Sequence, residues 1–150
     1  MKKTIAIAGL GWLGKPLAQH LLFSGYTVKG SVTSQRKATV LKESGIDTYV
    51  INSTEDGLYG AAQGFLKQVD TLVIMIPPGL RKNTGADYVL KMSHFLTEIL
   101  KSKVDNIIFI SSTSVYNDAQ GTVTEKQVPL PKTQAAKQLF QVEQLFFNAP

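Results

Sequence analysis

Residues 5–14 read Ile5-Ala6-Ile7-Ala8-Gly9-Leu10-Gly11-Trp12-Leu13-Gly14, an apolar run that ends in three glycines spaced G-x-G-x-x-G. The run predicts a strand over residues 3–8, and the following residues 13–24 predict a helix. A strand, a glycine turn and a helix in this order are the context that a dinucleotide-binding loop requires. In such a loop Gly9 allows the tight turn, Gly11 lets the backbone approach a pyrophosphate, and Gly14 lets the helix pack closely against the strand.

We expect this glycine turn to hold the phosphate groups of a dinucleotide. The free N–H groups of the first helical turn point toward such a ligand, and the helix dipole favours negative charge there. The expected cofactor contacts in the turn are Gly9, Gly11, Trp12, Leu13 and Gly14. The alternative is a glycine-rich turn that binds nothing.

Strand and helix patterns alternate along the rest of the chain, which predicts one domain over residues 1–150. Strands are predicted at 3–8, 26–32, 47–51, 71–76 and 106–110, and helices at 13–24, 34–45, 87–103 and 133–147, with a polar connection at 52–64. This alternation predicts an α/β fold, a doubly wound parallel sheet of the Rossmann type with strand order 3-2-1-4-5 and helices on both faces. A ligand should lie where the strand order reverses, beside Ile76, Pro77 and Pro78 at the end of the fourth strand.

The overall composition is that of an ordinary globular chain, with 43% hydrophobic and 18% charged residues. Cysteine is absent, which excludes a disulfide framework and a cysteine metal site, and we predict no metal site. The longest apolar run, near residues 71–78, is too short to span a bilayer. No signal-peptide pattern follows Met1, so we expect a cytoplasmic protein without a membrane partner.

Positive charge is concentrated at the start of the chain. The net charge is +5, residues 1–42 hold seven Lys or Arg, and all 11 acidic residues lie from Glu43 onward. A basic region can bind nucleic acid, but no Lys/Arg run with interleaved aromatic residues is present, so we expect no nucleic-acid partner. A cofactor rich in phosphate explains the same asymmetry.

The residues after the second predicted strand indicate which dinucleotide is bound. NAD-binding domains usually place an Asp or Glu there, on the ribose 2′-hydroxyl. Residues 31–37 contain no carboxylate but do contain hydroxyls, Arg36 and Lys37, which suit a 2′-phosphate. We therefore predict NADP, with NAD possible, and expect contacts from Thr33, Ser34 and Arg36. The alternative is that Arg36 and Lys37 form only a solvated first turn of a helix capped by Ser34.

A cluster of hydroxyl side chains follows the fifth predicted strand, in the order Ser111-Ser112-Thr113-Ser114-Val115-Tyr116. At the end of a central strand it should face the same crevice, and we expect Ser111 to contact the cofactor. With the glycine turn and the two prolines, this block resembles extended short-chain dehydrogenases/reductases. The chain is most similar to their atypical subgroup of NAD-dependent epimerase/dehydratase-like proteins, over essentially all 150 residues.

The resemblance implies that Ser112 and Lys137 are catalytic residues. In that family a Ser four residues before the Tyr of the Val-Tyr pair hydrogen-bonds the reacting oxygen, and Ser112 matches it. The acid pair of sugar-nucleotide dehydratases is replaced here by Thr113 and Ser114, which argues against that chemistry. Lys137 matches the Lys of the family's Y-x-x-x-K motif, but Thr133 stands at the Tyr and cannot replace it as a proton donor. Whether the chain is an enzyme therefore stays open. The alternative to a catalytic Lys137 is that this residue is an ordinary exposed lysine of the helix.

The resemblance also implies a function and an assembly. The implied function is the NAD(P)-binding domain of an epimerase/dehydratase-like oxidoreductase that acts on a sugar-nucleotide-like or other hydroxyl/carbonyl substrate. The substrate-binding part of that family, C-terminal to this domain, is not in these 150 residues. One alternative is a non-catalytic NADP(H)-binding sensor or regulatory module. The other is a cofactor domain of the β-hydroxyacid-dehydrogenase type, because residues 9–18 resemble the glycine turn of those enzymes. Family precedent implies a homodimer through the helices at 87–103 and 133–147.

Overall fold

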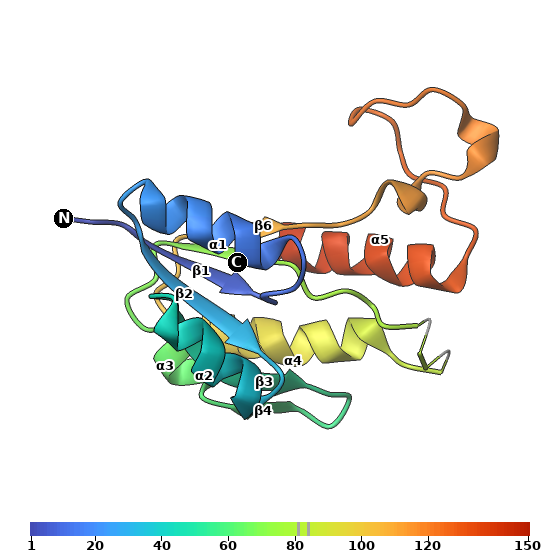
Figure 1. Ribbon diagram of the computed structural model, residues 1–150. Coiled ribbons are helices and arrows are strands. Elements are labelled where there is room, and N and C mark those ends of the chain that lie inside the picture. The colour runs from blue at the N-terminus through green and yellow to red at the C-terminus, as the bar shows by residue number, and fades with distance from the viewer. Residues whose placement is uncertain (81, 84) are drawn as a thin grey trace.

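Six strands form one sheet in the computed structural model, which describes residues 1–80, 82–83 and 85–150 (Figure 1). The strand order is β4-β3-β2-β1-β5-β6. The parallel strands are β1 (Thr4–Ala8), β2 (Thr27–Val32), β3 (Asp47–Ser53), β5 (Thr71–Ile74) and β6 (Asn106–Phe109). The predicted α/β class is confirmed, and the five parallel strands follow the predicted order.

The short strand β4 (Leu58–Gly60) is a correction to the predicted topology. It pairs antiparallel with the end of β3 and extends the sheet by one edge strand. Residues 52–64 were predicted to form a polar connection, because the two residues between Gly57 and Gly60 are too few to show a period-2 pattern. The register pairs Ser53 with Leu58, so β3 continues to Ser53, beyond its predicted end at residue 51.

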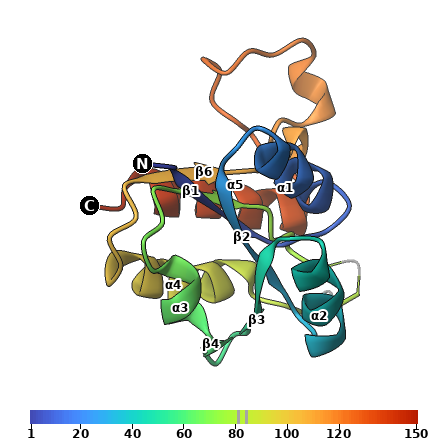
Figure 2. The same ribbon diagram turned by 60° about the vertical axis from the view of Figure 1, so that its left-hand side comes forward.

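In the described part of the chain, five α-helices cover the two faces of the sheet (Figures 1 and 2). They are α1 (Gly14–Phe23), α2 (Gln35–Glu43), α3 (Ala62–Leu66), α4 (Tyr88–Leu100) and α5 (Gln134–Phe147), and two short 3₁₀ turns lie at Thr113–Val115 and Asp118–Gln120. Helices α1 and α2 pack on one face, and α3, α4 and α5 pack on the other. No helix in the described part of the chain is both long enough and apolar enough to cross a membrane.

The central strand β1 is buried on both sides, as expected for a parallel sheet between two helical layers. Ala6 and Ala8 face the core formed with α4 and α5, while Ile7 faces the core formed with α1 and α2. All three side chains are fully buried. This two-sided burial explains why the first strand appears in the sequence as a continuous apolar run.

All five parallel strands end at the same edge of the sheet. The segments that follow β1, β2, β5 and β6 therefore come together, although they are far apart in sequence. The segment between β6 and α5, orange in Figures 1 and 2, also leaves the sheet at this edge and extends away from its body. In doubly wound folds this carboxyl edge is where ligands bind.

Candidate functional site

Two cavities lie on either side of the glycine turn at the carboxyl edge of the sheet. The serine-side cavity, of about 320 Å³, is lined by the turn, residues 75–78, the end of β6 and Leu139 of α5. The β2-side cavity, of about 400 Å³, is lined by the turn, residues 75–77 and the ends of β2 and β3. The two cavities share a wall made of Gly9, Gly11, Met75, Ile76 and Pro77. Together they suit a ligand with two bulky ends and a narrow middle.

The three glycines of the turn have different reasons to be glycine. Gly9 has a φ of +100°, and a Cβ there would lie 3.1 Å from the Met75 carbonyl oxygen. A Cβ on Gly14 would overlap the Gly9 carbonyl oxygen. A Cβ on Gly11 would meet no atom of the described residues within 4 Å. Packing within the chain therefore accounts for Gly9 and Gly14 but not for Gly11, which points to a ligand that approaches this backbone.

The amino terminus of α1 borders the serine-side cavity through Leu13 and Gly14 and has no side-chain cap, although the Lys15 N–H donates to the Gly11 carbonyl at 3.0 Å and Pro16 has no N–H. Among the described residues no side chain bonds to it, and its first turn contains no acidic residue. The helices α2, α4 and α5 are instead capped by Ser34, Asp87 and Thr133. Uncapped N–H groups at the positive end of a helix dipole are suited to bind phosphate.

The glycine turn is held in place from β2. The Gly9 N–H donates to the Ser31 hydroxyl at 3.0 Å, and the Leu10 N–H donates to the Ser31 carbonyl at 2.9 Å. Ser31 is buried and lines the β2-side cavity. Its hydroxyl therefore fixes the start of the turn.

The predicted serine residues differ in how free their hydroxyls are. Both Ser111 and Ser112 line the serine-side cavity. The Ser112 hydroxyl is exposed and accepts from the Ser114 N–H at 3.1 Å, whereas the buried Ser111 hydroxyl has no hydrogen-bond partner among the described residues. A buried hydroxyl without a partner is costly, so Ser111 is suited to bond a polar group of a ligand in this cavity.

The other predicted catalytic positions lie differently. Lys137 is exposed on α5 and lines neither cavity. The Thr133 hydroxyl accepts from the Ala136 N–H at 3.1 Å as the N-cap of α5. The structure therefore does not bring Lys137 and Ser112 together in a cavity, and it gives Thr133 a role in the helix.

The predicted contacts to the ribose are distributed around the β2-side cavity. Thr33 lines the cavity, but Ser34 and Arg36 do not. The Ser34 hydroxyl caps α2 by accepting from the Lys37 N–H at 3.4 Å. The basic residue that lines the cavity is Lys37, and among the described residues no Asp or Glu lines either cavity.

Sequence reasoning missed two polar residues of the β2-side cavity, Asn52 and Ser53. Both lie at the end of β3 and line the cavity. Asn52 Nδ2 donates to the Thr33 carbonyl at 3.4 Å, and the Ser53 hydroxyl donates to the Lys91 carbonyl at 3.0 Å. The predicted sheet order was enough to indicate these two residues, because β3 ends at the same edge of the sheet as β1 and β2.

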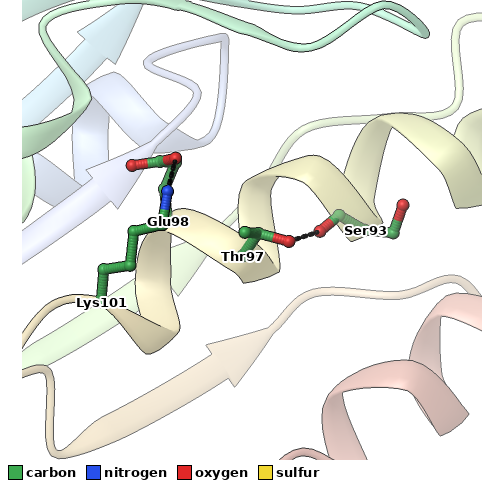
Figure 3. A network of polar contacts seen from close by, with 4 residues as sticks. All are labelled: Ser93, Thr97, Glu98 and Lys101. Carbon is green, nitrogen blue, oxygen red and sulfur yellow. Dashed lines mark hydrogen bonds and ion pairs between the residues drawn. The ribbon is translucent and has the colours of Figure 1, made fainter.

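A larger cavity, of about 660 Å³, lies at the opposite edge of the sheet and is not part of this site. It is lined by residues that precede β5 and β6, including Lys67, Glu98 and Lys101. Lys101 Nζ lies 2.8 Å from Glu98 Oε1, and the Thr97 hydroxyl donates to the Ser93 carbonyl one turn earlier (Figure 3). Its lining includes neither the G-x-G-x-x-G turn nor the start of α1, so we assign the ligand to the carboxyl edge.

A family model for the NAD-binding domain of 6-phosphogluconate dehydrogenase matches residues 4–128 of the chain. The chain belongs to this family of NAD-binding domains. The match includes the glycine turn and most of both cavities, so the ligand class of the site is a nicotinamide dinucleotide.

Known relatives are longer than this NAD-binding domain. Protein YeeZ of Escherichia coli K12 is 37% identical over 150 residues, which are 99% of this chain and 54% of that protein. The chain thus spans about half the length of the curated relatives that it matches.

Solved structures share the fold over almost the whole chain. The UDP-Glc/GlcNAc 4-epimerase from Campylobacter jejuni superposes with a TM-score of 0.78 at 16% identity, over 98% of this chain and 49% of the epimerase. Vestitone reductase from alfalfa superposes with a TM-score of 0.70 at 17% identity, over 99% of this chain and 54% of the reductase. At these identities the likeness shows the fold alone, and it confirms the expected Rossmann-like fold.

Proposed function

We propose that this NAD-binding domain binds NADP(H) in preference to NAD(H) and serves an epimerase/dehydratase-like oxidoreductase. The substrate class that we propose is a sugar-nucleotide-like or other hydroxyl/carbonyl compound. The observation that carries the proposal is the pair of cavities that share the Gly9–Gly11 turn and the Ile76–Pro77 wall. A dinucleotide has the same two-ended shape.

The chemistry of the lining residues suggests how the ligand is oriented. The β2-side cavity carries Thr33, Lys37 and Asn52, which suit a phosphorylated ribose and its base. The backbone at Gly11 and the free amino terminus of α1 suit the pyrophosphate. The serine-side cavity then takes the nicotinamide end, beside the free Ser111 hydroxyl.

The preference for NADP rests on charge in the β2-side cavity. Since no Asp or Glu of the described residues lines it, no carboxylate repels a 2′-phosphate. The Lys37 ammonium supplies an attractive charge in the first turn of α2. Arg36 is exposed and lines neither cavity, so we assign it a weaker, longer-range effect on the same phosphate.

The bound cofactor would supply hydride transfer, and this chain would supply binding and orientation. Ser111 offers a hydrogen bond within the serine-side cavity, and the exposed Ser112 hydroxyl lines the same cavity and has an O–H to donate to a reacting oxygen. Lys137 would act only if a ligand or further polypeptide brings it toward this cavity. We therefore propose catalysis for a protein as long as the curated relatives, and not for these 150 residues alone.

A second candidate is a non-catalytic NADP(H)-binding sensor or regulatory module. The cap formed by Thr133 favours it, because the position that holds the family's Tyr is occupied by a hydroxyl with a structural role. Binding without turnover of hydroxyl or carbonyl substrates would support the module. Turnover that is lost in Ser112→Ala would support the enzyme.

The only tryptophan of the chain gives a direct test of ligand binding. Trp12 is 89% exposed and lines the serine-side cavity, so a dinucleotide bound there lies beside its indole. We expect NADPH to quench Trp12 fluorescence in a saturable way. No quenching at millimolar NADPH would contradict the placement of the nicotinamide end.

We also propose a homodimer that uses α4 and α5. These helices pack side by side on one face of the sheet, and α4 exposes Leu90 and Leu100. Sedimentation that shows only monomer at high protein concentration would contradict the proposed homodimer.

A cytoplasmic location and the lack of a nucleic-acid partner remain predictions from the sequence.

A further inference from the structure

The first residue of α4, Tyr88, connects the helical layer to the wall between the two cavities. Its side chain is 1% exposed, and its hydroxyl donates to the Ile76 carbonyl at 2.5 Å. Ile76 lines both cavities. Tyr88 itself lines neither, so it acts on the site through Ile76.

The wall needs support of this kind because of its sequence. After Ile76 the chain continues with Pro77 and Pro78, which have no N–H and cannot donate a backbone hydrogen bond. The regular pairing of β5 ends at Ile74, and the Met75 N–H donates to the Ala8 carbonyl at 2.8 Å. Beyond Met75, the Tyr88 hydroxyl holds the chain at the point where it becomes the shared wall.

Helix α5 in turn fixes Tyr88. Gln138 is 7% exposed, and its Oε1 accepts from the Tyr88 N–H at 2.6 Å while its Nε2 donates to the Ala86 carbonyl at 3.2 Å. The next residue, Leu139, lines the serine-side cavity. Both polar atoms of the Gln138 amide are therefore used to hold the start of α4 against α5.

The turn after β3 holds the same helix end from the other side. Glu55 Oε1 accepts from the Asp87 N–H at 2.7 Å, and this turn follows Asn52 and Ser53 of the β2-side cavity. The amino terminus of α4 thus joins segments from both cavities. Tyr88 is the residue that extends this junction to their shared wall.

We propose that Tyr88 is a positioning residue whose buried hydroxyl sets the Ile76–Pro77 wall for both ends of the bound dinucleotide. This inference rests on the proposed function, in which the two cavities hold the two ends of NADP(H). Burial also raises the pKa of the Tyr88 hydroxyl above its usual value, so the hydroxyl stays a neutral donor throughout the physiological pH range.

The test compares Tyr88→Phe with Tyr49→Phe. The second variant also removes a tyrosine hydroxyl that makes a hydrogen bond, from Tyr49 to Asp47 Oδ2 at 2.8 Å, but Tyr49 lines neither cavity. We expect Tyr88→Phe to weaken NADPH binding about tenfold, because the Ile76 carbonyl loses its partner and the wall shifts. Tyr49→Phe should bind NADPH within about twofold of the wild type. Affinities are measured by calorimetry well below the unfolding temperature of each variant.

A purely structural role for Tyr88 would lower the unfolding temperature and leave the affinity of the folded protein unchanged. Equal NADPH affinity in Tyr88→Phe and the wild type therefore overturns the inference.

Amide hydrogen exchange at Met75, without ligand, separates this inference from the proposed function. We expect faster exchange at Met75 in Tyr88→Phe but not in Tyr49→Phe. If the wild type binds neither NADPH nor NADH, the proposed function fails. The amide exchange rate at Met75 then tests by itself whether Tyr88 positions the Ile76–Pro77 wall. Unchanged exchange at Met75 then overturns the positioning role.

Discussion

Helix α1 begins at Gly14 with no described side chain bonded to its amino terminus, whereas α5 begins after Thr133, whose hydroxyl caps it at 3.1 Å from the Ala136 nitrogen. The sequence predicted phosphate binding at the start of α1. In the first turns of α5 the resemblance implied a catalytic Lys137, whereas Thr133 was expected not to replace the family's Tyr. At the start of α1 no described side chain caps the helix, the Lys15 N–H donates to the Gly11 carbonyl, and Pro16 has no N–H, so the site offered to a ligand is the uncapped turn at Gly14. At the start of α5 the Thr133 hydroxyl accepts from the Ala136 N–H and the Thr133 carbonyl accepts from the Lys137 N–H. The difference teaches that a motif keeps a ligand role only where the fold leaves its polar groups free.

The same contrast separates Gly11 from Ser112. Nothing in the described chain requires glycine at position 11, so the space above it suits a ligand. The Ser112 hydroxyl already bonds the Ser114 N–H. Cofactor binding is thus supported by groups without internal partners, while the Ser112 hydroxyl accepts one hydrogen bond within the chain and keeps its O–H to donate to a ligand.

The largest effect should come from filling the space at Gly11. We predict that Gly11→Val leaves the folded structure intact but weakens NADPH binding about a hundredfold, since contacts to the charged pyrophosphate are lost. Calorimetry and thermal unfolding measure the two effects separately. Gly85→Val is the matched control, because Gly85 is also exposed and lines neither cavity. Equal NADPH affinity in Gly11→Val and Gly85→Val would contradict the claim that the start of α1 binds the ligand.

A smaller effect should follow from removing the cation of the β2-side cavity. We predict that Lys37→Ala weakens NADPH binding about tenfold and changes NADH binding by less than about twofold, because only NADPH carries the 2′-phosphate. Arg36→Ala is the control, since Arg36 lines neither cavity and should have the weaker effect. A larger loss in Arg36→Ala than in Lys37→Ala would assign the phosphate to the residue expected from the sequence.

The smallest effect should come from the cap of α5. We predict that Thr133→Ala lowers the free energy of unfolding by about 1 kcal/mol through loss of the cap. NADPH affinity should stay the same, because Thr133 lines neither cavity. Chemical denaturation and calorimetry measure these quantities, with Thr133→Ser as the variant that keeps the cap. Lost affinity in Thr133→Ala would show that the start of α5 contributes to the site.

Local sequence patterns were enough to predict the fold and the central part of the site. Gly9 and Gly14 are dictated by backbone conformation and packing, and the prolines after β5 mark the point where strand order reverses. These are properties of short segments, which a sequence displays directly. The cap at Ser34 was also predictable, because a Ser before a helical run is a local signal.

The rest depends on contacts that no short pattern contains. The choice between Arg36 and Lys37 depends on which side of α2 borders the β2-side cavity. Ser31 acts on Gly9 from a neighbouring strand, and Tyr88 acts on Ile76 from across a loop. Strand β4 was missed because Leu58–Gly60 is too short to show a period. Each of these depends on tertiary packing.

A calorimetric titration of the chain with NADPH and with NADH tests the central claim most directly. That claim is that a nicotinamide dinucleotide occupies both cavities, with a 2′-phosphate beside Lys37. We predict that one molecule of NADPH binds per chain, about tenfold more tightly than NADH. Equal or tighter binding of NADH would contradict the proposed role of Lys37, and binding of neither would contradict the proposed site.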